Sequence, residues 1–341
     1  MNVTPSLDNK TVPFADGSRA RFEGVAALAP IFVLAPPRSF TSIVCAMLGQ
    51  HPQLYGFPET QLFTTETIAG KLRNGPLAGH RIRDGLLRVV AQLYIGEQTQ
   101  TSVRLARGWL LRRSHFNTGY VFELLAERVY PLIPVEKSPD IVYDIVSLQR
   151  TLRFFPQARF IHLLRHPRGY CDSNLRYYRA LQQRGQRLPP WMFCSAADST
   201  PGAAAGNPNA AGVLDPQKGW LSHNMRIRRF FESVPNEQKT WIRGEDLLTD
   251  PDQRLRQIAD WIGLRTDPEA LGQMKHPERS PYAFIGPPNA RYGNSRTFLE
   301  NPTLRPDLAK PYSLDGPLPW REDGQGFLPE VKRLASEFGY S

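Results

Sequence analysis

The sequence predicts a single α/β domain in which helices flank a central parallel sheet, and two observations carry this prediction. First, short continuous apolar runs alternate with amphipathic segments between residues 31 and 262. Runs that are apolar throughout are typical of parallel strands, because such strands are covered on both faces. Second, 41% of the 341 residues are hydrophobic, which is ample for a core. This alternation indicates a doubly wound sheet that binds ligands at the carboxyl ends of its strands.

Five apolar segments are the expected strands, and most segments between them read as helices. The expected strands are 31–35, 54–57, 133–139 with its exit, 159–164 and 239–243. The expected helices are 41–50, 82–95, 120–129, an amphipathic helix ending at 154, 168–182, 220–231, 254–262 and 328–338. Pro58 opens a further helix or turn at Glu59, because proline suits a first helical position.

The chain is expected to divide into a core domain with two extensions. Residues 1–24 form an N-terminal extension, residues 25–300 the domain, and residues 301–341 a C-terminal extension that packs on the domain. Within the domain, 184–218 is expected to be a flexible insertion. Its stretch 199–212 is rich in Ala, Gly, Pro and Asn and cannot bury a core.

The net charge of +10 favours anionic partners. A basic surface that only aids solubility explains the charge equally well. Nucleic acid is disfavoured, since the chain has no zinc-finger spacing, no aromatic RNP-like strand and no dense run of Lys and Arg.

Cysteine usage and hydropathy indicate a cytoplasmic protein. Cys45, Cys171 and Cys194 are an odd number without a CxxC pair, which argues for a reducing compartment. The histidines show no metal-ligand spacing, so no metal site is expected. Residues 1–20 are polar and do not read as a signal peptide, and the apolar stretch 25–37 is too short for a transmembrane segment.

The first polar loop follows the strand at 31–35 and offers Arg38, Ser39, Thr41 and Ser42. The helix after it directs unpaired backbone N–H groups and a partial positive charge toward the loop. An arginine adds a cation with bidentate reach, and the hydroxyls add donors. The loop therefore predicts a phosphate cradle, although an ordinary strand–helix turn is the alternative. It is not a Walker A loop, because GxxxxGK[ST] is absent.

A second polar loop follows the strand at 159–164 and offers Arg165, with Ser173 eight residues later. In isolation this pair could be a capping arginine and a solvated serine. Two anion-binding strand ends in one sheet suit a nucleotide that is phosphorylated on both its 5′ and its 3′ side.

Together the two loops resemble the sulfotransferases that use 3′-phosphoadenosine 5′-phosphosulfate (PAPS). Residues 37–42 are similar to the family pattern P-[RK]-S-G-T-[TS] and depart from it at Phe40, where the family usually has glycine. Phe40 is expected to pack beside the cofactor or the acceptor. Arg165 and Ser173 match the family's ligands of the 3′-phosphate. The resemblance runs from about residue 31 to residue 298 and implies the sulfotransferase fold, a P-loop-like sheet.

Three further runs extend the resemblance. Glu136-Lys-Ser-Pro139 is similar to [ED]-K-[ST]-P, whose lysine faces the transferring group, and this implies a catalytic role for Lys137 beside Arg38. Residues 244–248 are similar to Y-E-D-L near the adenine, with Gly244 in place of the tyrosine. Trp241 or another aromatic residue is expected to stack there instead. A late loop resembles the one that closes over the 3′-phosphate; its residues are Arg291, Tyr292, Gly293 and Asn294.

The residues after Lys137 and those after the first helix bear on which residue is the general base. The histidine that cytosolic members carry after Lys-Thr is missing after Lys137. Branches such as the tyrosylprotein type use a glutamate shortly after the first helix, and Glu59 fits that position. The chain thus looks like a bacterial-type member with a glutamate base, related to the tyrosylprotein and modular-synthase branches. The alternatives are that Glu59 serves a helix N-terminus or that His115 is the base. His51 and His162 are expected to be structural.

The resemblance implies in-line transfer of a sulfuryl group from PAPS to a hydroxyl of a small-molecule, lipid or carrier-bound acceptor, with PAP as product and no metal. Two other functions stay open. One is a nucleotide-dependent, kinase-like enzyme, and the other is a non-enzymatic binder of anions or nucleic acid.

Overall fold

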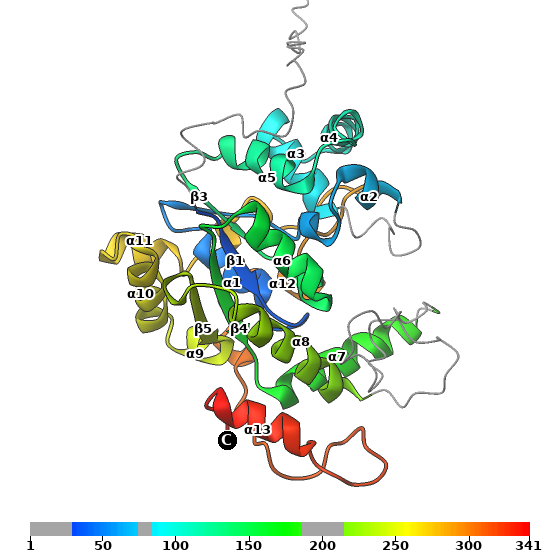
Figure 1. Ribbon diagram of the computed structural model, residues 1–341, viewed down its shortest axis with the longest axis vertical. Helices are drawn as coiled ribbons and strands as arrows, with labels where there is room; N and C mark the ends of the chain where they lie inside the picture. Colours follow the sequence, from blue (N-terminus) through cyan, green and yellow to red (C-terminus); the bar gives the residue numbers. More distant parts are fainter. Residues whose placement is uncertain (1–28, 74–83, 184, 186–214) are drawn as a thin grey trace, which may run out of the picture.

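The computed structural model describes residues 29–73, 84–183, 185 and 215–341. Its centre is a five-stranded sheet with the order β2-β3-β1-β4-β5, in which all neighbouring strands are parallel. The strands are β1 (Ile31–Leu34), β2 (Leu54–Gly56), β3 (Ile133–Glu136), β4 (Arg159–Leu164) and β5 (Lys239–Arg243). The predicted α/β class with a parallel sheet is confirmed, and helices lie on both sides of the sheet (Figure 1).

The two faces of the sheet are buried in two separate hydrophobic clusters. Ile31 and Val33 of β1 pack in one cluster, and Phe32 and Leu34 pack in the other. This follows from the strand's period of two, because successive side chains point to opposite faces. The first cluster is covered by α1 (Thr41–Leu48), α9 (Gly244–Thr249), α10 (Pro251–Ile262) and α11 (Pro268–Gln273). The second is covered by α3 (Asp84–Ile95), α4 (Gln100–Arg112), α5 (Thr118–Glu127), α6 (Ile145–Phe154) and α8 (Pro216–Phe231).

The C-terminal residues pack at the end of the molecule occupied by α7 (Pro167–Gln182) and α8 (Figure 1). Leu314, Leu334 and other apolar side chains there, several from α13 (Pro329–Glu337), bury Trp220 completely. Arg168 donates four hydrogen bonds to carbonyl oxygens, from Nε to Ser313 at 3.0 Å, from Nη2 to Asp315 at 2.7 Å and to Gly316 at 3.5 Å, and from Nη1 to Pro317 at 3.1 Å.

The sequence patterns missed several helices and misplaced some ends. The helices not predicted are α2 (Ile68–Arg73), α4, α9, α11 and α12 (Arg296–Glu300). The start of α4 has a capping box formed by Thr99 and Ser102, whereas the recognisable sequence signature has Glu or Gln as its second partner. The helix expected from residue 220 begins four residues earlier at Pro216. The expected extension 1–24, residues 186–214 of the expected insertion, and Cys194 lie outside the described residues.

Cys45 and Cys171 are both buried free thiols. Within the described ranges, no helix is long and apolar enough to cross a bilayer.

His162 of β4 and His223 of α8 are buried in the interior, as expected for His162. The His162 Nε2 donates to Asn224 Oδ1 at 2.8 Å, and Asn224 in turn donates to the Trp220 carbonyl at 2.7 Å. Burial disfavours the charged imidazole and lowers the pKa of His162 to about 4 and that of His223 to about 3.

We expect these histidines to make the fold acid-sensitive. An unfolded histidine binds a proton below about pH 6.5. The folded state binds none at His162 until about pH 4. The contribution of His162 to the free energy of unfolding is therefore fully present above about pH 6.5. Between that pH and about pH 4 it falls by about 1.4 kcal/mol for each pH unit. Urea unfolding from pH 4 to 7 measures this slope. His162→Gln, which keeps a donor for Asn224, should make it shallower; an unchanged slope would contradict the assignment.

Candidate active site

The predicted site residues lie at the carboxyl ends of four adjacent strands. In the order of the sheet, Glu59 follows β2, Lys137 follows β3, the loop 37–42 follows β1, and Arg165 follows β4. The carboxyl ends of parallel strands share one edge, which is where such sheets bind ligands. We call this edge of β2, β3, β1 and β4 the carboxyl edge. Residues that are far apart in the sequence thus form one row.

The first loop has an unusual backbone for residues other than glycine. Arg38 has φ 70° and Phe40 has φ 62°, both in the left-handed region. Glycine adopts this conformation without a steric cost, which explains why the family pattern has glycine at the position of Phe40. Here the phenylalanine takes up the same backbone region at a cost of about 1–2 kcal/mol. Phe40 is also the N-cap of α1 and supplies no side-chain hydrogen bond to it.

Two guanidinium groups, of the partly buried Arg38 and the buried Arg165, join the first loop to the second. Arg38 Nε donates to Ser173 Oγ at 3.3 Å, and Arg165 Nη1 donates to the carbonyl oxygen of Arg38. Burial lowers the pKa of both arginines, that of Arg165 to about 10, where the nearby Glu245 carboxylate opposes the shift. Both stay charged at neutral pH, and neither forms an ion pair within the described residues.

Unpaired donors accompany these charges. Ser39 Oγ and Arg165 Nε are buried and have no hydrogen-bond partner among the described residues. A buried polar group without a partner costs about 1–3 kcal/mol, so such groups indicate a missing partner. Two cations without an ion-pair partner in the described chain, two orphan donors and the open N-terminus of α1 fit an anionic ligand with more than one phosphate.

Lys137 connects the first loop to the predicted base. Its ammonium is fully buried and donates to Ser42 Oγ at 3.0 Å and to Glu59 Oε1 at 2.7 Å. Ser42 Oγ also accepts from the backbone N–H of Ser295 at 2.9 Å. The Glu59 side chain is 25% exposed, so its carboxylate lies between the buried lysine and solvent.

The backbone of Glu59 is held by its neighbours on the carboxyl edge. Its N–H donates to the Gly293 carbonyl at 2.6 Å. The next residue, Thr60, donates to the buried Glu136 carboxylate at 2.7 Å, and the Gln61 N–H donates to Ser138 Oγ at 2.8 Å. The next helical turn, η1, begins only at Leu62 with Gln61 as its N-cap. The alternative role for Glu59 at a helix N-terminus is therefore wrong.

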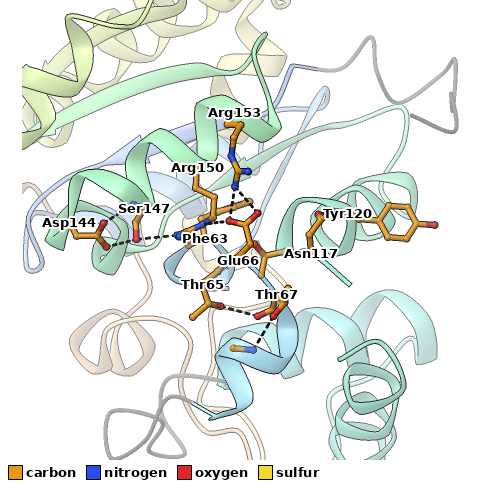
Figure 2. A network of polar contacts seen from close by, with 12 residues as sticks. Phe63, Thr65, Glu66, Thr67, Asn117, Tyr120, Asp144, Ser147, Arg150 and Arg153 are labelled. Carbon is orange, nitrogen blue, oxygen red and sulfur yellow. Dashed lines mark hydrogen bonds and ion pairs between the residues drawn. The ribbon is translucent and has the colours of Figure 1, made fainter. Parts of the chain in front are cut away.

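A surface network anchors the segment that follows Glu59. Arg153 and Arg150 of α6 contact the Glu66 carboxylate at 2.6 Å and 3.1 Å (Figure 2). Arg150 also donates to the Phe63 carbonyl at 2.5 Å. Exposed ion pairs of this kind contribute little free energy. Their effect here is geometric, because they fix the chain after Glu59 against α6.

The late loop, residues 291–294, lies against the backbone of Glu59, whose N–H donates to the Gly293 carbonyl. Tyr292 N–H donates to Asp84 Oδ2 at 3.0 Å, and the buried Arg88 donates to the Tyr292 carbonyl at 2.9 Å. Gly293 has φ 104°, and a Cβ there would lie 2.6 Å from the Cα of Gly85. These contacts place the loop beside Glu59 and α3. The role of Arg291–Asn294 at a 3′-phosphate remains a prediction.

Sequence reasoning missed two charged residues near Glu59. Burial, and after it the Glu59 carboxylate, raise the pKa of Asp140 to about 7, and Lys71 opposes the shift. Lys71 is buried and donates to the Gln61 carbonyl. Asp140 follows the Lys137-Ser-Pro run directly and could have been noticed, whereas the sequence around Lys71 gives no signal. His115, the alternative candidate for the base, is exposed, and its ring centroid lies 4.4 Å from that of Phe116.

A family model described as "Sulfotransferase family" matches residues 30–268, which hold the first loop, Glu59, Lys137 and Arg165. The match covers more than half of the chain, so the protein belongs to the sulfotransferase family. No curated protein sequence matches the chain.

Solved sulfotransferase domains have the same fold. The chain superposes on the sulfotransferase domain from the curacin biosynthetic pathway with a TM-score of 0.68 and 22% identity, over 92% of this chain and 98% of that one. The sulfotransferase domain of the Synechococcus PCC 7002 olefin synthase gives 0.65 and 24%, over 92% and 95%. The predicted family and fold are thus confirmed.

Gly85 provides a test of how tightly Glu59 is held. A Cβ at Gly85 would lie 2.0 Å from the Glu59 carbonyl oxygen, whereas at Gly108 of α4 it would meet only the tip of the Arg112 side chain at 3.5 Å. Alanine in a helix gains up to about 1 kcal/mol over glycine. We expect Gly108→Ala to stabilise the protein and Gly85→Ala to destabilise it by about 1–3 kcal/mol. Chemical unfolding measures the change in unfolding free energy of each variant. If both variants are stabilised or both are destabilised, the close contact between Gly85 and Glu59 is contradicted.

Proposed function

We propose that the protein transfers a sulfuryl group from PAPS to a hydroxyl group of a small-molecule, lipid or carrier-bound acceptor, with Glu59 as general base. The observation that carries the proposal is the position of Lys137, which bonds both Ser42 of the phosphate loop and Glu59. A general base must lie close to the acceptor hydroxyl, and that hydroxyl must lie close to the sulfuryl group that it attacks. The lysine links the carboxylate to the loop that would hold the 5′-phosphosulfate.

The residues at the carboxyl edge fit the donor nucleotide. The loop 38–42, with its orphan Ser39 hydroxyl and the start of α1, would hold the 5′ side. Arg165, with its unpaired Nε, and Ser173 would hold the 3′-phosphate. Arg38 contacts both parts, because it lies in the loop and bonds Ser173.

PAPS supplies an activated sulfuryl group, and PAP is the product. Glu59 accepts the proton of the acceptor hydroxyl as its oxygen forms the new bond to sulfur. Lys137 and Arg38 would stabilise the negative charge that develops on the 5′-phosphate oxygen as its bond to sulfur breaks. These groups are already in place, so little reorganisation is required at the moment of reaction.

Calorimetric titration with PAP, AMP and ATP is the direct test of the donor site. Binding of PAP that depends on its 3′-phosphate supports the proposal. Equal binding of the three nucleotides, or none, would favour the kinase-like or the non-enzymatic alternative.

Glu59→Gln should lower kcat by about 10²–10⁴ because it removes the base. PAP binding should survive, since the amide oxygen can still accept a hydrogen bond from Lys137, whereas the free energy of unfolding should fall because the buried ammonium loses its counter-ion. The control is Asp140→Asn, which changes the neighbouring carboxyl. If Glu59→Gln has near-normal turnover and Asp140→Asn does not, the base is Asp140.

Arg165→Ala should weaken PAP binding by about 10- to 150-fold, the scale of a hydrogen bond to a charged group. Affinity for AMP should change far less, because AMP has no 3′-phosphate. Arg179→Ala, an exposed change on α7, is the matched control. A folded Arg165→Ala variant that still distinguishes PAP from AMP as the wild type does would refute the 3′ assignment.

A further inference from the structure

Phe40 and Gly244 are the two places where the chain departs most clearly from the family pattern. The pattern has glycine and tyrosine at these positions, and this chain has phenylalanine and glycine. The two residues are far apart in the sequence, yet a Cβ at Gly244 would lie 2.5 Å from Cδ2 and 3.2 Å from Cε2 of the Phe40 ring. The ring therefore lies directly on the Gly244 backbone and excludes any larger residue there.

The same ring contacts the cation of the second loop. The Arg165 guanidinium carbon lies 4.2 Å from the Phe40 ring centroid, within the range of a cation–π contact. Phe40 is 9% exposed and Arg165 is 8% exposed. Such contacts are strongest where both partners are desolvated. The ring thus interacts with an arginine that lacks an ion-pair partner among the described residues.

Within the described residues the Arg165 guanidinium donates one hydrogen bond, so most of its five N–H groups are available to a ligand. Nη1 donates to the Arg38 carbonyl oxygen. A Cβ at Gly169 would lie 3.3 Å from Nε. Nε therefore lies against the first turn of α7 and has no partner. With the Phe40 ring on the guanidinium and Arg38 at one end, the guanidinium is restricted in rotation.

We propose that Phe40 is a positioning residue of the nucleotide site, whose ring holds the Arg165 guanidinium in place to receive a 3′-phosphate, and that glycine at position 244 makes room for it. The left-handed backbone at Phe40 supports this, because strained residues persist where the surrounding structure determines them and cluster at functional sites. The inference rests on the proposed donor.

The test compares affinities for PAP and AMP by calorimetry. Phe40→Leu keeps an apolar side chain at the same backbone position and removes the aromatic face. The ratio of PAP to AMP affinity should fall by about three- to thirtyfold, the range of a cation–π contact. AMP affinity and unfolding free energy serve as controls. An unchanged ratio, or an equal loss for both nucleotides, overturns the proposal.

A second set of variants tests the contact between Phe40 and Gly244 and does not depend on Phe40→Leu. Gly244→Ala places a methyl group against the ring and should lower the same ratio. In the Phe40→Gly background the ring is absent and the atom nearest to the methyl is the Leu164 carbonyl oxygen at 3.3 Å, so Gly244→Ala should lower the ratio much less there. Equal effects in both backgrounds would show that Gly244→Ala does not act through the Phe40 ring, and would overturn the role proposed for Gly244. If the wild type itself shows no preference for PAP over AMP, the proposed donor fails instead.

Discussion

The buried Lys137 ammonium is the interaction on which the rest of the carboxyl edge depends. A charge that is fully removed from water is costly unless it is paired and hydrogen-bonded, and Lys137 meets both conditions through Glu59 and Ser42. Each partner is itself fixed from a different strand end or loop. Ser42 is held by Ser295 and Glu59 by Gly293, so the late loop completes the environment of the lysine. Loss of either partner would leave a buried charge uncompensated.

The charges along the carboxyl edge are balanced at one end and not at the other. At the β2–β3 end, Lys137 is paired with Glu59. At the β1–β4 end, Arg38 and Arg165 lie close together without a carboxylate partner in the described chain. The fold tolerates this because burial is incomplete and backbone and hydroxyl groups accept some of the hydrogen bonds. The carboxyl edge therefore has an unpaired positive charge at its arginine end and an ion pair at its lysine end.

The sequence predicted the strands and the residues that follow them because both depend on local signals. Apolar runs identify the strands, and loops such as 37–42 begin where those runs stop. The contacts that position Glu59 could not be predicted, because they join distant segments without any local pattern. Gly85 and Gly293 are ordinary glycines in the sequence, and only the folded chain shows that their backbones touch. The same is true of Phe40 and Gly244, where each departure from the family pattern was visible alone but their contact was not.

The central position of β1 has a consequence for how the protein folds. Ile31 pairs with Val135 on one side and with Arg159 on the other. The strand that precedes the loop 37–42 can therefore pair only with segments that lie more than 100 residues later in the chain. Such non-local pairing is slow, because long loops must close before any contact compensates for their lost entropy. The left-handed residues of the loop gain their support only after this closure. A ligand that binds the completed carboxyl edge and not the unfolded chain would therefore stabilise the native state by mass action.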